Sequence, residues 1–200
     1  LVYRVGMVQA QDSGGSIRYK RGVVFWTFLL INGRPREKGC TYPALSRSAG
    51  GLNKAGSDTE IRHVGGKPVG GCIGCGGCRS GNGCVFGGVV NEAIEKAKTA
   101  DGFVFGSPVH YASASGNMTS FMDRLSYAGG KYLAYKPAAI CCSARRAGTT
   151  PTLDQLVKYP PFFHMPLVKG SYWAMVHGFN AEPVLQDAQG CAAMPELQQE

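Results

Sequence analysis

Half of the cysteines in this chain lie in one short glycine-rich run, "CIGCGGCRSGNGC", from Cys72 to Cys84. Two, two and five residues separate Cys72, Cys75, Cys78 and Cys84. A CxxCxxC triple is typical of iron-sulfur ligation, whereas structural zinc usually takes two CxxC pairs that lie a dozen or more residues apart. We therefore interpret the four thiols as ligands of a [4Fe–4S] cluster. A zinc site and a loop of metal-free thiols are the alternatives.

The remaining cysteines argue for a reducing environment. Eight cysteines in 200 residues are too few for a disulfide scaffold, and the four in the run are too close in sequence to close useful loops. Cys141 and Cys142 lie in an apolar segment, and we expect them to be buried core thiols. The thiols of the run are then free for metal or redox chemistry.

Length, hydropathy and charge exclude several classes of protein. A chain of 200 residues with 44% hydrophobic residues predicts one domain with an ordinary core. The longest apolar run, Val23 to Ile31, is about half of the roughly 20 residues that a membrane span needs, and no signal pattern precedes it, so we expect a cytoplasmic protein. The net charge is +8, but the basic residues are scattered without a basic helix or zinc-finger spacing. This argues against a nucleic-acid partner.

Short apolar runs alternate with amphipathic helical patterns from about residue 23 to the end of the chain. The predicted strands are 28–32, 59–64, 102–109, 137–143 and 165–173. The predicted helices are 41–56, 89–100, one with an apolar stripe over 118–125, one that opens with 152–159 and that Pro160 and Pro161 must end or kink, and a segment after residue 183. Such alternation implies a parallel sheet with helices on both faces. We predict an α/β fold, a doubly wound five-stranded parallel sheet in a three-layer domain over residues 23–200. Residues 1–22 form an extension without a sustained period, and residues 72–84 form a cysteine-rich insertion.

Ligands bind such sheets at the carboxyl ends of the strands, so the loops after the apolar runs are candidate sites. The loop after the first run, "NGRPREKGCT" at residues 32–41, combines two glycines, two arginines and a lysine directly before a helix. This composition suits a phosphate group, with an ordinary basic turn as the alternative. The loop is not a Walker loop and the chain has no GxGxxG, which favours a phosphomonoester over a dinucleotide.

Two further loops have the composition of ligand-binding walls. Residues 106–118, "GSPVHYASASGNM", offer the flat rings of His110 and Tyr111 together with small polar residues. Residues 143–152, "SARRAGTTPT", are also polar and contain a glycine. Three such loops at the positions that a doubly wound sheet uses for ligands predict a flat, phosphorylated ligand.

From about Thr27 to Gly190 the chain resembles the NAD(P)H-dependent FMN reductases of the flavodoxin-like superfamily, and among them the iron-sulfur flavoproteins. "LLINGRPREKGCT" is similar to the phosphate loop "GSPRxxGNT", "GSPVHYASASGNMTSFMDR" is similar to the flavin loop "SPVYYxSxxGxxKxFxDR", and the cysteine run is similar to the cluster motif. The resemblance implies that the FMN phosphate is bound by Arg34, Arg36, Cys40 and Thr41, and that the flavin ring is lined by Ser107, Pro108, Val109, His110, Tyr111, Ser143 and Gly148. The chain departs from the family at three of these positions: Arg34 replaces serine, Cys40 replaces asparagine and His110 replaces the usual tyrosine.

The resemblance also implies a function. An FMN-dependent oxidoreductase would pass electrons from NAD(P)H through FMN to a quinone, a nitro or azo compound or an electron carrier, with the cluster as a further carrier. FMN supplies the hydride chemistry, so no catalytic side chain is assigned, and His110 is a candidate proton donor to the acceptor. A homodimer or homotetramer is implied as well. A non-enzymatic flavin and iron-sulfur electron carrier is the alternative function, and a zinc protein that binds nucleic acid is a third. Because the cysteine run follows the second predicted strand, we expect it near the flavin end of the sheet.

Overall fold

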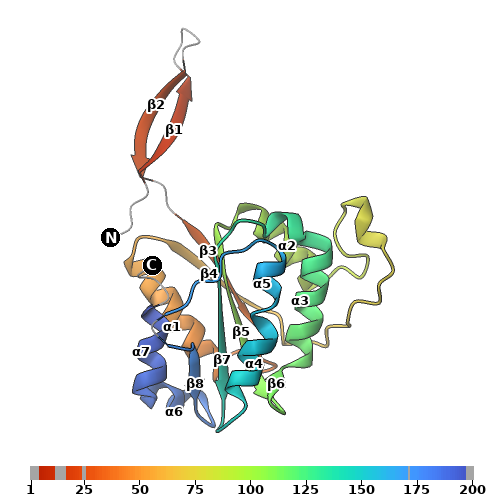
Figure 1. Cartoon of the computed structure of the whole chain (residues 1–200), viewed down its shortest axis with the longest axis vertical. Coiled ribbons are helices and arrows are strands. Elements are labelled where there is room, and N and C mark those ends of the chain that lie inside the picture. Colours follow the sequence, from red (N-terminus) through yellow and green to blue (C-terminus); the bar gives the residue numbers. More distant parts are fainter. Residues whose placement is uncertain (1–4, 12–16, 24–25, 171, 197–200) are drawn as a thin grey trace.

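The fold is organised around a five-stranded parallel sheet, seen edge-on in Figure 1, in a computed structural model that describes residues 5–11, 17–23, 26–170 and 172–196. The strands are β3 (Thr27–Asn32), β4 (Asp58–His63), β5 (Gly102–His110), β7 (Ala138–Ala144) and β8 (Met175–His177). They lie in the order β4-β3-β5-β7-β8, and every neighbouring pair on this path is parallel. This is the doubly wound order of flavodoxin-like sheets, so the predicted fold class is confirmed.

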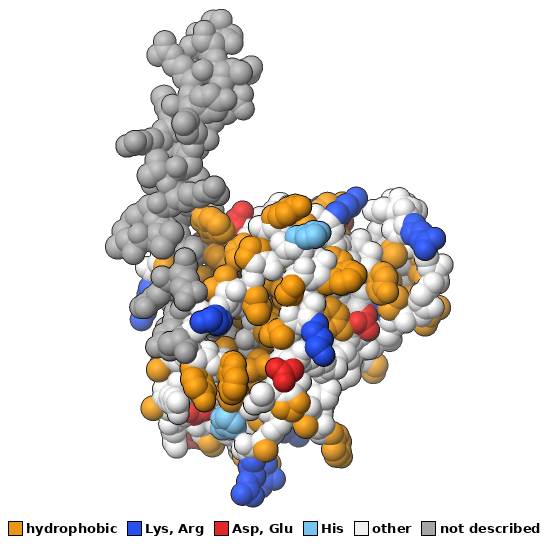
Figure 2. All heavy atoms as spheres, viewed as in Figure 1, with side chains coloured by type: hydrophobic (Ala, Val, Ile, Leu, Met, Phe, Trp, Pro, Cys, Tyr) orange, Lys and Arg blue, Asp and Glu red, His pale blue; other side chains and the backbone are white. Residues whose placement is uncertain are grey.

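Helices cover both faces of the sheet (Figure 1). The first face carries α1 (Thr41–Lys54), α6 (Ala181–Gln186) and α7 (Ala188–Glu196), and the second carries α2 (Val89–Thr99), α3 (Gly116–Gly129), α4 (Thr149–Leu156) and α5 (Tyr159–Phe162). Figure 2 shows hydrophobic side chains gathered at the surface in the middle of the molecular face that Figure 1 presents. No helix in the described part of the chain is both long enough and apolar enough to cross a membrane.

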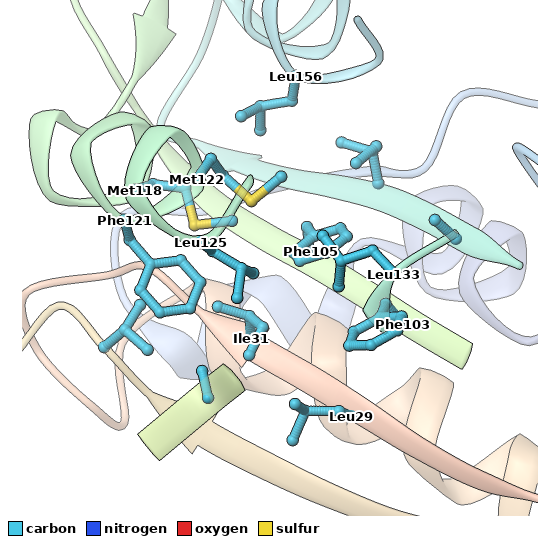
Figure 3. Close-up of a cluster of buried hydrophobic side chains, with 14 of the residues drawn as sticks. Leu29, Ile31, Phe103, Phe105, Met118, Phe121, Met122, Leu125, Leu133 and Leu156 are labelled. Carbon is cyan, nitrogen blue, oxygen red and sulfur yellow. The ribbon is translucent and has the colours of Figure 1, made fainter. Parts of the chain in front are cut away.

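Alternating side chains along the strands build two cores, one on each face. Leu29 and Ile31 point into the core beneath α2, α3 and α4, whereas Leu30 between them points into the core beneath α1. Successive side chains of a strand face opposite sides, so a sheet buried on both faces needs continuous apolar strands. The first core, shown in Figure 3, joins Phe103 and Phe105 of β5 to Met118, Phe121, Met122 and Leu125 of α3.

The two adjacent cysteines of β7 follow the same alternation. Cys141 lies in the core beneath α1 and Cys142 in the opposite core, and both are fully buried. Burial raises the pKa of Cys141 to about 12 and also raises the pKa of Cys142, because the thiolate form is not solvated there. The prediction that these are structural core thiols is confirmed, and they are not nucleophiles near neutral pH.

The segment before the domain contains a hairpin that the sequence did not predict. β1 (Val5–Gln11) and β2 (Ile17–Val23) pair antiparallel and form a separate two-stranded sheet, drawn in red in Figure 1. These strands do not pair with the central sheet. The apolar pattern of residues 23–31 therefore includes the end of β2 as well as most of β3.

The predicted fifth strand, residues 165–173, is misplaced. In the structure the fifth strand is β8, and the described residues of the predicted segment, 165–170 and 172–173, contribute only an isolated parallel bridge between Leu167 and Ala138. Pro166 has no N–H to donate and Gly170 weakens a strand, so the ladder does not extend through the segment. The predicted break before Pro160 and Pro161 is present, since α4 ends at Leu156 and α5 begins at Tyr159 with both prolines in its first turn.

Candidate functional site

Three loops meet at the carboxyl edge of the sheet. The Gly33 N–H after β3 donates to the Gly106 carbonyl at 2.9 Å, and the Ser115 hydroxyl before α3 donates to the Gly33 carbonyl at 2.8 Å. Thr41 at the start of α1 shares a buried hydrogen bond of 2.8 Å with Ser143 of β7. These bonds hold the loops after β3, β5 and β7 together, as the sequence predicts for a single site.

Ser107, a predicted flavin contact, uses its side chain to hold the loop after β5. The Ser107 hydroxyl accepts the Ser115 N–H at 3.0 Å and donates to the Pro108 carbonyl at 2.9 Å, and it is fully buried. Ser115 also caps α3, because its hydroxyl accepts the Met118 N–H at 3.3 Å. Ser107 therefore acts in this structure through the loop geometry and not through a free hydroxyl.

The loop after β3 presents positive charge beside the start of α1. A side chain at Gly39 would collide with Nε of Arg34, so the guanidinium lies directly over that glycine. Nε of Arg34 is buried and has no hydrogen-bond partner within the described residues. The backbone of Arg34 is fixed from both sides, since its N–H donates to Asn32 at 3.2 Å and its carbonyl contacts His63 Nε2 at 2.7 Å. Arg36 is exposed nearby in sequence.

The first turn of α1 is open to an anion. Cys40 occupies the N-cap position without a side-chain capping bond, and the first turn holds no acidic residue. The Cys40 thiol is buried and donates to the Gly178 carbonyl at 3.4 Å, while the Thr41 hydroxyl is paired with Ser143. The Tyr42 N–H already donates to the Gly39 carbonyl at 2.9 Å and Pro43 has no N–H. The dipole of a 14-residue helix, together with Arg34, therefore favours a phosphate here more than the N–H groups of the turn do.

The tip of the flavin loop is a tight turn of two left-handed residues. Tyr111 and Ala112 have φ of 51° and 58°, and they join His110 to Ser113, which pairs with it as the start of β6 (Ser113–Ala114). Non-glycine residues adopt this conformation at a cost, and such strain is common at functional sites. Tyr111 is fully exposed, and a side chain at Gly148 would come within 2.8 Å of Ala112 Cα. The close approach of Gly148 packs the third loop beneath the turn.

The four cysteines of the run line one cavity of about 200 Å³. Cys72 and Cys75 are exposed, and Cys78 and Cys84 are half-buried. Four interleaved glycines adopt left-handed conformations that let the backbone turn between the thiols: Gly74, Gly76, Gly81 and Gly83. Nowhere in the described ranges do three His, Cys, Asp or Glu side chains converge closely enough to hold a single metal ion. A [4Fe–4S] cube takes one thiolate at each of four corners, and the run supplies four thiols around one cavity.

The cysteine cavity lies away from the expected place at the flavin end of the sheet. Its walls include Arg124, Tyr127 and Ala128, which belong to the second half of α3. Figure 1 shows the yellow cysteine segment on the outer side of α3, away from β6. From Gly116 to Arg124 the helix axis rises by ~12 Å. The segment leaves the end of β4 but crosses over α3 before α2 begins, which strand order alone does not reveal.

Two residues that the sequence did not single out hold Cys84. Asn91 accepts the Cys84 N–H at 2.8 Å and donates to its carbonyl at 3.0 Å, and Arg124 donates from Nε to the sulfur at 3.2 Å. Arg124 is the last residue of the quoted flavin-loop motif, which assigned it no role, and it also lies between Phe121 and Leu125 of the apolar helix stripe. A buried arginine at such a position needs partners, but the sequence does not name them.

A family model described as NADPH-dependent FMN reductase matches residues 27–180. The chain belongs to this family. An iron-sulfur flavoprotein from Methanocaldococcus jannaschii is 33% identical over 94 residues, which are 47% of this chain and 49% of that protein. Another from Methanosarcina thermophila is 24% identical over 169 residues, which are 83% of this chain and 88% of that protein. The matches to the first two curated relatives, unlike that to the Methanosarcina protein, span only about half the length of those proteins.

A solved structure of an NAD(P)H:quinone oxidoreductase from Methanothermobacter marburgensis is similar with a TM-score of 0.66 and 15% identity, covering 88% of this chain and 98% of that chain. A structure of the Trp repressor binding protein from Bacillus subtilis gives a TM-score of 0.65 at 17% identity, covering 86% and 98%. At these identities the likeness concerns the fold, and it agrees with the flavodoxin-like strand order.

The buried pair of Thr41 and Ser143 predicts coupled stabilities. Thr41→Val or Ser143→Ala alone leaves the other hydroxyl buried without its partner, which lowers the free energy of unfolding by about 1–3 kcal/mol. The double variant loses less than the sum, with a coupling of about 0.5–3 kcal/mol, because no unpaired hydroxyl remains. Urea denaturation of the four proteins measures this coupling.

The exposed pair of Thr59 and Asn53, whose side chains are 3.0 Å apart, supplies the control. The same cycle made with Thr59→Val and Asn53→Ala gives additive changes, because water replaces the lost bond. Additive changes at Thr41 and Ser143 would show that their hydrogen bond does not link α1 to β7.

Proposed function

We propose that the protein is an FMN-dependent oxidoreductase that takes electrons from NAD(P)H and passes them to a quinone, a nitro or azo compound, or an electron carrier. The observation that carries this proposal is the combination of an arginine and a helix N-terminus in the loop after β3. Arg34 holds a buried, unpartnered Nε beside the uncapped N-terminus of α1, at the edge where three loops meet. Membership of the NADPH-dependent FMN reductase family supports the same cofactor and electron donor.

The residues of the chain would divide the binding of FMN between them. Arg34, Arg36 and the first turn of α1, with Cys40 and Thr41 as its opening residues, would hold the phosphate. When bound, FMN accepts two electrons as a hydride and releases them singly, so the protein needs to position the ring and does not need an acid-base side chain for that step.

The ring itself would lie against the loops after β5 and β7. Pro108, Val109 and the strained turn at Tyr111 would form one wall, with Ser143 and Gly148 behind it. His110 is exposed at the end of β5, where it remains our candidate for protonating a reduced acceptor.

We also propose that Cys72, Cys75, Cys78 and Cys84 hold a [4Fe–4S] cluster. The support comes from one cavity lined by all four thiols and from the similarity to iron-sulfur flavoproteins. A cluster there would pass single electrons between the flavin and an acceptor. In the alternative, a flavin and iron-sulfur electron carrier, the same groups exchange electrons between proteins without oxidising a nicotinamide.

Two further proposals concern the oligomeric state of the protein and its location in the cell. We infer a homodimer or homotetramer, supported by large exposed hydrophobic side chains such as Tyr135, Phe162, Tyr172 and Trp173. Large contiguous patches of exposed apolar surface mark sites of interaction with other proteins, membranes or ligands. We infer a reducing, cytoplasmic location, supported by eight cysteines that are all free.

Rapid mixing with nicotinamide nucleotides tests the enzymatic proposal. Purified protein should show flavin absorbance, iron and acid-labile sulfide, and NADPH or NADH should bleach the flavin bands within the time of a catalytic turnover. Flavin that neither nucleotide reduces would support the electron carrier. Zinc without flavin would contradict both functions.

Arg34→Ala tests the phosphate site. Loss of charge-assisted hydrogen bonds worth about 1.5–3 kcal/mol weakens FMN binding ~10- to 150-fold. Riboflavin lacks the phosphate, so its affinity stays unchanged, and titration of both flavins measures the difference. Arg47→Ala, which removes an exposed arginine from α1, is the matched control and keeps the FMN affinity. An equal loss for riboflavin would mean that Arg34 only shapes the loop.

Cys78→Ser tests the cysteine ligands. The variant should lose its iron while it retains FMN, because the cavity and the flavin loops are held by separate contacts. Metal analysis and flavin absorbance of the same sample give both values. Cys191→Ser replaces a buried thiol that bonds Val184 at 3.2 Å, and it should leave the iron content unchanged. Wild-type iron content in Cys78→Ser would remove Cys78 from the ligand set.

A further inference from the structure

Arg124 carries a buried positive charge beside the cysteine cavity. It is only 6% exposed, and its guanidinium donates to the Cys84 sulfur at 3.2 Å, the Gly70 carbonyl at 3.3 Å and the Gly87 carbonyl at 2.9 Å. No carboxylate of the described residues forms an ion pair with it. The neighbouring Asp123 is engaged by the Tyr159 hydroxyl at 2.6 Å.

A buried guanidinium without a carboxylate is costly unless another negative group compensates it. The two carbonyls supply partial charges only. The Phe86 ring, whose centroid lies 5.6 Å from Cζ, adds a cation–π contact that is weaker than an ion pair. The other partner is the Cys84 sulfur, and four cysteine thiolates carry more negative charge than the 2+ core or ion that such a set binds. The environment of Arg124 is thus complementary to an anionic site in the adjacent cavity.

The same side chain also ties the ends of the cysteine segment together. Gly70 precedes Cys72 and Gly87 follows Cys84, so the two carbonyl contacts clamp both ends of the segment to α3. Asn91 fixes the backbone of Cys84 independently from α2. The segment between these anchors is exposed and rich in glycine, so its order depends on the clamp.

We propose that Arg124 is a positioning residue of the cysteine site, which clamps the segment before metal binding and neutralises part of the thiolate charge afterwards. A nearby positive charge stabilises the more negative, reduced form of a bound cluster and so raises its reduction potential. This inference about the cluster rests on the proposed cysteine ligands, whereas the clamp does not require a metal. Arg79 lines the same cavity but is exposed, so water screens its charge.

Two variants of the full chain, Arg124→Gln and Arg79→Gln, compare the effect of removing a buried positive charge with that of removing an exposed one. In EPR-monitored redox titrations, Arg124→Gln should lower the equilibrium constant for one-electron reduction of the cluster about tenfold, equivalent to ~59 mV. Arg79→Gln should change it much less. Arg124→Lys keeps the charge and should recover most of the potential. Equal shifts of the reduction potential in the two glutamine variants, or no shift in Arg124→Gln, would contradict the proposed role of Arg124 as a counter-charge.

Amide hydrogen exchange of the metal-free chain tests the clamp without a cluster. Arg124→Gln should speed exchange at least tenfold within residues 72–87 and leave the flavin loops unchanged, whereas Arg79→Gln should not alter it. If Arg124→Gln binds no iron but keeps its FMN, the hydrogen exchange decides the proposal. Faster exchange confined to residues 72–87 supports it, and exchange at the wild-type rate overturns it. Absence of iron from the wild-type protein would refute the proposed cluster, and the hydrogen exchange would still test whether Arg124 clamps the segment.

Discussion

β3 pairs in parallel with β4 on one side and β5 on the other, so the carboxyl ends of these strands lie along one edge of the sheet. Parallel strands need crossover helices, and the apolar strands bury both faces beneath those helices. The loops after β3, β5 and β7 are therefore brought to the same place, and short bonds such as that from Gly33 to Gly106 join them. The candidate site is a consequence of this pairing, because its residues lie far apart in sequence.

Helix α3 links the two candidate sites and also separates them. Ser115 at its start is bound to the Gly33 carbonyl, which belongs to the phosphate loop. Arg124, two turns further along, is bound to both ends of the cysteine segment. The rise of ~12 Å between these places along the helix gives the flavin loops and the cysteine cavity separate anchors on one rigid element.

Local patterns predicted the fold because each long element has its own hydrophobic period. The α3 stripe of Met118, Phe121 and Leu125 is buried as predicted, and the alternation within β3 builds both cores. β8 was missed because three residues carry too little periodicity, and the neighbouring Pro166 segment had a stronger apolar run. The β1–β2 hairpin was missed because its strands do not pair with the apolar sheet.

The candidate site could be predicted in part, since residue composition marks loops but not the partners of their side chains. The glycines and arginines after β3 pointed to an anion site, and the structure adds that Arg34 Nε is buried without a partner among the described residues. The pairing of Thr41 with Ser143, and of Cys84 with Arg124, joins residues 102 and 40 positions apart. Such contacts depend on how the crossovers pass over the sheet, which local sequence does not encode.

The eight thiols of this chain differ in chemistry because the fold places them in different surroundings. Cys141 and Cys142 lie in cores where no cation compensates a thiolate, and burial raises both pKa values. Cys84 is half-buried too, but an arginine donates to its sulfur and α2 holds its backbone. Burial therefore disfavours a thiolate on the strand, whereas the Cys84 sulfur has a cationic hydrogen-bond donor on α3. This contrast favours the glycine-rich segment over the strand as the candidate metal site, although the two strand cysteines are closer together in sequence.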